Sequence, residues 1–481
     1  MATLTGLRPH PIYLAGRWVE SPDVLVIERP GYPGEPAGAT YLATAAQYDE
    51  AVDAAVAAFE TTRRMPGYER ARILHEISAG IKARREELAP LIALEAGKPI
   101  RDALTEVDRA VITFRLGAEE AERMYGEVIP MDSGPASRGR IGIVRRFPIG
   151  PIAGISPFNF PLNLAAHKVA PAIATGNPIV LKPPSKDPLV MLAVAEIIDA
   201  AGAPHGSVSI LPMSRALGDR MVEDERFKLL SFTGSPAVGW RMKARAGKKK
   251  VVLELGGNAG VIVDESADLD WAVKRVLLGA FAYAGQVCIS VQRIFVHDAV
   301  RDAFLERLVA GIARLNVGDP LDPQTDVGPM VDEGVVARTA EWVAEAVASG
   351  ARILAGGTAD GCFFAPTVIV DAPRDAKVCT EEAFAPLVVV ESFADFDRAI
   401  RGVNDSRFGL QAGVFTNDLA HSWHAFEELH VGGVIINDIP TYRVDHMPYG
   451  GVKDSGVGRE GLRFAMEDMT EPRIMVVAQP T

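Results

Sequence analysis

The sequence predicts an α/β protein with two units of mixed structure and a projecting β-arm. From residue 151 to 257, short apolar strands alternate with helical segments, a pattern typical of a parallel sheet buried on both faces. After about residue 258 a second series of apolar strands begins, and a chain of 481 residues is too long for one ordinary core. Between Glu127 and Gly150, Pro, Gly and Ser lead into a segment that we expect to leave the domain body as an arm.

Hydrophobic periodicity places the individual elements. Residues 45–130 are expected to be a helical region, with helices over Ala46–Phe59, Tyr68–Arg85 and Thr105–Tyr125, and polar–apolar alternation predicts a strand over Arg140–Phe147. The first sheet should contain the strands Ile152–Ile155, Pro178–Leu181, Ser207–Leu211, Leu229–Phe232 and Val251–Leu255, joined by the helices Leu164–Ala174, Leu189–Ala201, Ala216–Glu223 and Ala237–Ala246. The second unit should contain the strands Val261–Val263, Ile294–Val296, Thr367–Ile369 and Val388–Val390, and the tail should add Arg473–Val477.

Composition excludes several classes of protein. The formal net charge of −12 argues against non-specific binding to nucleic acid, which needs a basic field. No apolar run reaches the length of a membrane span, and Met1–His10 lacks the features of a targeting segment. Three cysteines make no disulfide framework and fit a reducing cytoplasm, and no Cys/His cluster has metal-ligand spacing. We therefore expect a cytoplasmic protein without a metal.

Four polar segments fall where predicted strands of the first sheet end. In parallel sheets, ligands bind beyond the carboxyl ends of the strands. We therefore expect one binding crevice built from Pro157–Pro161, Lys182–Lys186, Thr233–Ser235 and Leu255–Asn258.

Two glycine patterns resemble phosphate-binding motifs. Gly456-Val-Gly-Arg-Glu-Gly461 matches the dinucleotide fingerprint by letter, but no predicted strand precedes it and only 20 residues follow, so we interpret it as a turn leading into a helix. Gly234-Ser-Pro-Ala-Val-Gly239 follows a predicted strand and precedes a helix, which Ser235 would cap. The N-terminus of that helix would face a pyrophosphate, and a simple strand-to-helix turn is the alternative.

Cys288 and Glu254 are the candidate nucleophile and base. Cys288 lies in a segment opened by Gly285, and Glu254 ends an apolar strand, where burial would raise its pKa and suit it to general-base chemistry. The alternative for Cys288 is a small buried hydrophobe, which is how we interpret Cys362 and Cys379. Asn159, in a turn bracketed by prolines, either donates to an oxyanion or satisfies the backbone of its own turn.

These segments together resemble the aldehyde dehydrogenase superfamily, and the resemblance covers nearly the whole chain. It is carried by Pro157-Phe-Asn-Phe-Pro161, Lys182-Pro-Pro-Ser185, Phe232-Thr-Gly-Ser235, Leu253-Glu-Leu-Gly-Gly257, Gly285-Gln-Val-Cys288, Glu381-Glu-Ala-Phe-Ala-Pro386 and Pro448-Tyr-Gly-Gly451, which arrive in the family's order. The resemblance implies a Rossmann-like NAD(P)-binding domain (1–125 and 151–254, with 448–470 returning to it), a catalytic domain (255–447) and an oligomerisation arm (126–150 and 471–481). It also implies a homodimer or homotetramer.

The resemblance further assigns roles to single residues. Cys288 would attack an aldehyde, Asn159 and the Cys288 amide would hold the oxyanion, and Glu254 would activate the water that hydrolyses the thioester. Glu382 would hold the nicotinamide ribose and Phe384 would pack beside the nicotinamide. The other residues assigned to NAD or NADP are Ser156, Phe158, Lys182, Ser185, Gly234, Ser235, Gly239, Leu255 and Gly256.

Four residues of this sequence bear on which cofactor and which substrate the protein would use. Many relatives that use only NAD carry a glutamate where this chain has Ser185, and with Lys186 next to it we hypothesise use of NADP as well as NAD. Arg115 and Arg443 are candidates to pair with an anionic tail on the aldehyde, such as succinate semialdehyde, glyceraldehyde 3-phosphate or lactaldehyde-class substrates, and ordinary ion pairs are the alternative. Other functions left open are a non-catalytic member of the fold, a coenzyme A-acylating semialdehyde dehydrogenase and a thioesterase.

Overall fold

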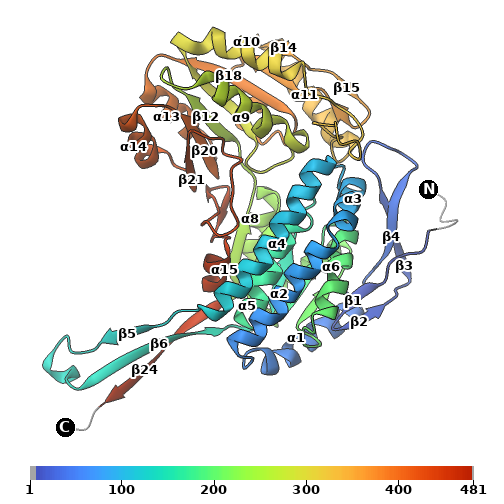
Figure 1. The fold of residues 1–481 in the computed structure, drawn as a ribbon, viewed down its shortest axis with the longest axis vertical. Coiled ribbons are helices and arrows are strands. Elements are labelled where there is room, and N and C mark those ends of the chain that lie inside the picture. Colours follow the sequence, from blue (N-terminus) through green and yellow to red (C-terminus); the bar gives the residue numbers. More distant parts are fainter. Residues whose placement is uncertain (1–6, 479–481) are drawn as a thin grey trace.

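The computed structural model describes residues 7–478. Two large sheets, each covered by helices on both faces, lie at opposite ends of the body, and a thin arm projects from the first (Figure 1). Residues 1–6 of the expected segment 1–125 and residues 479–481 of the expected tail lie outside the described residues. Within residues 7–478, no helix is long and apolar enough to cross a membrane.

The first sheet has eight strands in the order β2-β1-β9-β8-β7-β10-β11-β23. The order of its five parallel strands is that of a doubly wound nucleotide-binding sheet, in which the ligand crevice lies where the strand order reverses, here between β7 and β10. The parallel strands are β7 (Ile152–Ile155), β8 (Ile179–Lys182), β9 (Val208–Ile210), β10 (Leu229–Thr233) and β11 (Lys250–Glu254), and the antiparallel edges are β1 (Ile12–Leu14), β2 (Arg17–Val19) and β23 (Gly456–Val457).

Helices cover both faces of this sheet. Successive strand residues face opposite layers: Ile152 packs in one apolar cluster and Ala153 in the other. The strands are therefore apolar throughout, which is why their sequence identifies them. One layer contains α2 (Gly67–Ala83), α3 (Arg85–Ala96), α4 (Ile100–Glu122), α5 (Asn163–Thr175) and α6 (Leu189–Ala200), and the other contains α1 (Ala45–Thr62), α7 (Arg215–Glu223) and α8 (Pro236–Arg245).

The second sheet has seven strands in the order β14-β17-β18-β13-β12-β20-β21, parallel except for β14. Its strands are β12 (Ala259–Val263), β13 (Val291–His297), β14 (Arg352–Ala355), β17 (Thr367–Val370), β18 (Leu387–Phe393), β20 (Gln411–Phe415) and β21 (Gly433–Ile436). The helices α9 (Leu269–Phe281), α10 (Arg301–Ile312) and α11 (Glu333–Ala348) cover one face, and α13 (Phe396–Asn404) and α14 (Leu419–Glu428) cover the other.

The arm is a three-stranded antiparallel sheet of β5 (Glu127–Pro130), β6 (Arg140–Pro148) and β24 (Thr470–Ala478). It brings the C-terminal strand back against the middle of the chain, so that Thr470 pairs with Pro148 and Ala478 with Arg140. The smaller elements are β3 (Asp23–Glu28), β4 (Pro36–Leu42), β15 (Ala359–Asp360), β16 (Phe363–Phe364), β19 (Phe408–Gly409), β22 (Val452–Lys453), α12 (Lys377–Thr380) and α15 (Leu462–Asp468).

The structure corrects the sequence-based prediction at three places. The expected helical region 45–130 ends at Glu122, because the arm begins with β5, and the expected helix Tyr68–Arg85 stops at Ala83 before the unpredicted α3. The strands β1–β4 were not predicted: β1 and β2 have three residues each, and β3 and β4 flank a Pro- and Gly-rich turn. Gly456 does open a turn leading to α15, but it also belongs to β23, which pairs with β11.

Candidate active site

The residues before Cys288 hold strained backbone. Tyr283 and Ala284 have φ of 49° and 52°, in the left-handed region that side chains with a Cβ rarely occupy. Gly285 follows with φ of 68°, and a Cβ there would lie 2.1 Å from the Ala385 carbonyl oxygen. Only glycine fits this position, and the strained turn delivers Cys288 to the boundary between the two sheets.

Cys288 is hydrogen-bonded to a buried tyrosine. Its Sγ lies 2.9 Å from the Tyr449 hydroxyl. Burial raises the pKa of Cys288 to about 11, while the Tyr449 hydroxyl and the charge of Arg443 act in the opposite direction by stabilising the thiolate. The Cys288 side chain is therefore a thiol at neutral pH, and a nucleophilic role would require the loss of its proton.

Glu254 ends β11 and is 3% exposed. Neither carboxyl oxygen has a hydrogen-bond partner within residues 7–478. Burial, followed by repulsion from Glu460, raises the pKa of Glu254 well above its usual range. It also lies beside the tyrosine loop, because a Cβ on Gly450 would be 2.7 Å from its Oε1. A buried, unpaired carboxyl with a raised pKa has the properties of a general base for water.

Asn159 lies against the segment that carries Cys288. It is buried, and its Nδ2 donates to the Gln286 carbonyl at 3.0 Å. Gln286 is held in turn, since its Oε1 accepts the amide of Val331 at 2.8 Å. The side-chain amide of Asn159 retains a second hydrogen, which an oxyanion formed beside Cys288 can accept.

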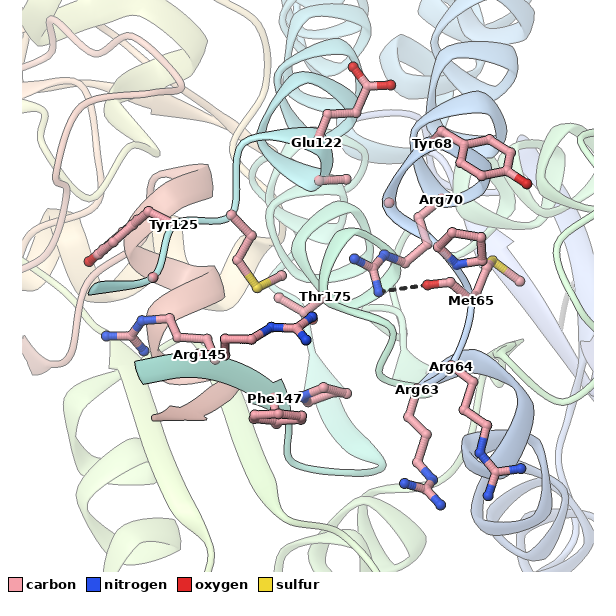
Figure 2. Close-up of a pocket in the computed structure, with 17 residues that line it drawn as sticks. Arg63, Arg64, Met65, Tyr68, Arg70, Glu122, Tyr125, Arg145, Phe147 and Thr175 are labelled. Atoms are coloured by element: carbon pink, nitrogen blue, oxygen red, sulfur yellow. Dashed lines mark hydrogen bonds between the residues drawn. The ribbon is translucent and has the colours of Figure 1, made fainter. Parts of the chain in front are cut away.

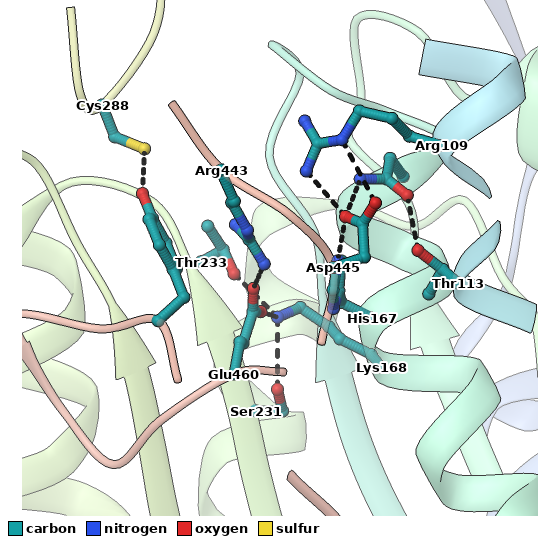
Figure 3. A network of polar contacts seen from close by, with 12 residues as sticks. Arg109, Thr113, His167, Lys168, Ser231, Thr233, Cys288, Arg443, Asp445 and Glu460 are labelled. Carbon is teal, nitrogen blue, oxygen red and sulfur yellow. Dashed lines mark hydrogen bonds and ion pairs between the residues drawn. The ribbon is translucent and has the colours of Figure 1, made fainter. Parts of the chain in front are cut away.

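A buried ionic network lies behind Tyr449 (Figure 3). The Arg443 guanidinium stacks 3.8 Å from the centre of the Tyr449 ring and donates to Glu460 at 2.9 Å. Lys168 donates to the other oxygen of Glu460 at 3.2 Å and to Thr233 at 2.7 Å. Although burial opposes ionisation, Lys168 and Arg443 bring the pKa of Glu460 down to about 2. Glu460 is therefore ionised and repels charge on the base.

A second part of the network centres on Asp445. Its carboxylate accepts from Arg109 at 2.7 Å, from Asn163 at 3.1 Å and from His167 Nε2 at 2.9 Å. Burial, followed by repulsion from Arg443, lowers the pKa of His167, so its ring is neutral near pH 7. Two buried nitrogens, His167 Nδ1 and Arg443 Nε, have no partner within residues 7–478.

The crevice beyond β8 and β9 is cationic. Burial, followed by repulsion from Arg215, lowers the pKa of Lys182 to about 8. Lys182 Nζ lies 3.4 Å from the Ser185 hydroxyl, whereas Lys186 forms an ion pair with Asp332. The cation that we expected beside a 2′-phosphate is therefore already paired, and Lys182 with Arg215 supplies the positive charge.

The remaining cofactor candidates lie at the carboxyl ends of β7, β10 and β11. Ser235 occupies the N-cap of α8, but its side chain makes no capping hydrogen bond, so the expectation that it caps this helix is wrong. The Ser156 hydroxyl is buried without a partner in the described chain. Gly239 lets α8 approach Leu255, since a Cβ there would lie 2.4 Å from that side chain, and Gly234 begins the turn before Ser235.

Glu382 and Phe384 enter this crevice from the second unit. Glu382 accepts the Gly257 amide at 3.1 Å, and burial raises its pKa to about 7. A Cβ on Gly256 would lie 2.1 Å from its Oε2, so any larger residue there would displace this carboxylate. Phe384 packs edge-to-face on Phe158 with ring centres 5.8 Å apart. The two rings join the turn after β7 to the second unit.

The structure thus brings together candidates from both units, but Arg115 is not among the residues in the network. Arg115 is half exposed and pairs with Glu119 one helical turn away. Sequence reasoning missed several network residues. For two of them, His167 and Lys168, the available signal was their position within the mostly apolar helix α5. The missed residues are Arg109, His167, Lys168, Arg215, Asp445, Tyr449 and Glu460.

Comparison with known proteins gives the family. Residues 18–475 match the model of the aldehyde dehydrogenase family. The chain is 43% identical to 3-sulfolactaldehyde dehydrogenase of Priestia megaterium over 99% of this chain and 100% of that protein. It superposes with a TM-score of 0.96 on aldehyde dehydrogenase 21 of Physcomitrella patens in complex with the product succinate, at 46% identity and 98% of each chain. It also superposes with a TM-score of 0.91 on the glyceraldehyde-3-phosphate dehydrogenase GapN of Methanocaldococcus jannaschii complexed with NADP, at 40% identity over 95% of this chain and 99% of that one. The chain therefore belongs to the aldehyde dehydrogenase family and is an NAD(P)-dependent aldehyde dehydrogenase.

Proposed function

We propose that the protein oxidises a small anionic aldehyde to its carboxylic acid, with Cys288 as nucleophile, Asn159 as oxyanion donor and Glu254 as the base for hydrolysis. The observation that carries this proposal is the placement of an unpaired buried carboxyl and a hydrogen-bonded thiol on either side of the Tyr449–Gly450 loop. The catalytic groups are all present, which argues against a non-catalytic member of the fold.

In the first half-reaction, Cys288 loses its proton and its thiolate adds to the aldehyde carbon. Tyr449 stabilises the thiolate through the 2.9 Å hydrogen bond, and the positive charge of Arg443 acts in the same direction. The carbonyl oxygen becomes an alkoxide, to which Asn159 Nδ2 and the Cys288 amide donate.

The crevice residues fit NAD or NADP. Lys182 and the N-terminus of α8 would hold the phosphates and ribose, while Glu382 and Phe384 would hold the nicotinamide end. The unpartnered Ser156 hydroxyl is consistent with a ligand there. When bound, the cofactor supplies the hydride acceptor of the reaction.

Loss of hydride from the alkoxide carbon re-forms the carbonyl and leaves a thioester on Cys288. In the second half-reaction, Glu254 takes a proton from a water molecule that attacks the thioester carbon. The carboxylic acid leaves and Cys288 recovers its thiol. Because Glu254 has no other partner in the described chain, its oxygens are free for water. Transfer of the acyl group to coenzyme A would need no such base, so we propose hydrolysis.

The charge of the network favours an anionic substrate. Three cations (Arg109, Lys168 and Arg443) face two carboxylates (Asp445 and Glu460), which leaves a net positive charge when Glu254 is protonated. The unpartnered Arg443 Nε would donate to a sulfonate, carboxylate or phosphate. His167 donates from Nε2 to Asp445, so its unpartnered Nδ1 would accept a hydrogen bond from an adjacent hydroxyl of the substrate. The relatives named after sulfolactaldehyde and glyceraldehyde 3-phosphate, and the relative solved with succinate, support this class.

An aldehyde panel tests the substrate class. The panel compares the anionic aldehydes 3-sulfolactaldehyde, succinate semialdehyde and glyceraldehyde 3-phosphate with the neutral aldehydes lactaldehyde and propanal, each with NAD and NADP. We expect kcat/KM for at least one anionic aldehyde to exceed that for propanal by about tenfold or more, and Arg443→Gln to reduce this ratio. Arg115→Gln is the control and should leave the ratio unchanged. A preference for propanal would reject the anionic class, and release of free acid without coenzyme A checks hydrolysis separately.

A further inference from the structure

A cavity of 670 Å³ lies at the base of the arm, away from the cofactor crevice (Figure 2). It is bounded by β6, by the start of α2 and by the C-terminal ends of α4 and α5. Pro148, which lines it, precedes the first parallel strand β7, so the cavity lies at the amino ends of the sheet strands. The cofactor crevice lies at their carboxyl ends, and no residue assigned to it lines this cavity.

Arginines dominate the lining of the cavity. Among the described residues, the one carboxylate that lines it is Glu122, and Figure 2 shows Glu122 pointing away from Arg70. This is a concentrated positive region on a protein with a formal net charge of −12. The arginines are Arg63, Arg64, Arg70, Arg145 and Arg146, of which Arg63 and Arg64 share Glu60 as an ion-pair partner.

Arg70 is the most informative of the five. Its guanidinium donates to the Met65 carbonyl at 3.1 Å, its Nε is buried without a partner, and it forms no ion pair within residues 7–478. Burial alone lowers its pKa. Arg293, which is buried, also lacks a carboxylate partner, but it donates to the carbonyls of Asn258, Gly402 and Val403. Arg70 is partly buried and lacks such partners, so its guanidinium lines the cavity with donors to spare.

The start of α2 faces the same cavity. Its N-cap is Pro66, which makes no side-chain capping bond, and the amides of Gly67 and Tyr68 have no acceptor among the described residues. α2 has 17 residues, so the helix dipole places a partial positive charge of about half an elementary charge at its N-terminus. Pro66, Gly67 and Tyr68 all line the cavity. Free helix amides beside guanidinium groups form a combination that binds phosphate in proteins.

We propose that this cavity binds a small phosphate-bearing molecule, with Arg70, Arg145 and the first-turn amides of α2 contacting the phosphate. Arg145 lies on β6 opposite Arg70 and forms no ion pair within residues 7–478, and its planar guanidinium suits two phosphate oxygens at once. The volume falls within the range of about 300–1,000 Å³ of small-molecule sites. Tyr68 and Phe147 line the cavity beside these groups and offer apolar surface to the rest of the ligand.

Titration calorimetry with inorganic pyrophosphate tests the site in the intact enzyme. The enzyme is first saturated with NADP, so that the cofactor crevice is filled. We expect one pyrophosphate to bind per chain, and Arg70→Gln and Arg145→Gln each to weaken binding by about tenfold or more. The control is Arg85→Gln, which removes a surface arginine paired with Asp108 and Glu86 and should leave affinity unchanged.

The outcomes that would overturn the proposal are distinct. Absence of binding to the unsubstituted enzyme would reject it, as would binding that neither Arg70→Gln nor Arg145→Gln weakens. If Arg145→Gln changes the oligomeric state in light scattering and pyrophosphate does not bind, the cavity is a subunit contact and the proposal is wrong. Arg145 is exposed, so its replacement should fold normally and keeps the test valid if Arg70→Gln is unstable.

Discussion

The Tyr449 hydroxyl lies 2.9 Å from Cys288 Sγ, and the same tyrosine ring lies 3.8 Å from the Arg443 guanidinium. Tyr449 therefore joins the nucleophile to the buried ionic network that also surrounds Glu254. The thiol, the base and the network residues come from segments far apart in the chain, and the loop containing Tyr449 and Gly450 is where they meet.

Replacing Tyr449 by Phe should make the thiol harder to ionise. The hydroxyl stabilises the thiolate, so its loss should raise the pKa of Cys288 further and move the pH profile of iodoacetamide alkylation to higher pH. We expect alkylation at neutral pH to slow by about tenfold, the equivalent of one hydrogen bond to a charged group. Tyr442→Phe is the control because Tyr442 is exposed. An unshifted profile in Tyr449→Phe would contradict the role of this contact.

Deacylation should accelerate as pH rises. The pKa of Glu254 is raised, so its carboxyl is protonated at low pH and becomes an active base only as pH increases. Pre-steady-state measurements can separate the initial burst of NADH or NADPH from the slower turnover that includes deacylation. The rate of this slower phase should rise with pH. A deacylation rate that falls or stays constant from pH 6 to 9 would contradict this assignment.

Glu460→Gln should shift that profile to lower pH and destabilise the protein. Removing the Glu460 charge removes repulsion of the Glu254 carboxylate, so the pKa of Glu254 should fall. The substitution also leaves Lys168 and Arg443 without their carboxylate, at a cost of about 3–5 kcal/mol for a broken buried pair. Chemical denaturation measures the loss of free energy of unfolding, with the surface variant Glu119→Gln as control. A deacylation profile displaced to higher pH would contradict this expectation.

Ser185→Glu should convert the cofactor preference towards NAD. A carboxylate beside Lys182 would repel a 2′-phosphate, so kcat/KM with NADP should fall by about tenfold or more while that with NAD is maintained. Arg215→Gln should lower NADP use for the complementary reason, because it removes positive charge near Lys182. Lys186→Gln should have little effect, since Lys186 is paired with Asp332. Equal losses with both cofactors would reject this explanation.

The parallel strands could be predicted because burial on both faces makes them continuously apolar, as in Ile152–Ile155. The sequence singled out Cys288, Glu254 and Asn159 as candidates because each is a polar residue at a strand end or in a Gly- or Pro-bracketed turn, and the resemblance to the family supplied their proposed roles. The strands β1 and β2 have three residues each, too few for a periodic signal, whereas β3 and β4 have six and seven residues and are less buried than the parallel strands.

The ionic network could not be predicted because it depends on tertiary distance. Lys168 and Glu460 are 292 positions apart, and nothing local to either residue identifies the other. The ion pair of Lys186 with Asp332 could not be predicted either, since Asp332 approaches from a distant segment. Arg443 was singled out because it lies shortly before the Pro448 motif, but its stacking on Tyr449 could be seen only in the folded structure.

Mass spectrometry of Glu254→Gln tests the central claim most directly. The variant is mixed with a preferred aldehyde and NAD or NADP, quenched during the slow phase, and digested. We predict a burst of NADH or NADPH of about one equivalent per active site, with the acyl group of the substrate attached to Cys288. Deacylation should be slowed by about 100-fold or more. A steady-state rate equal to that of the unsubstituted enzyme, or an acyl group found on a residue other than Cys288, would contradict the account.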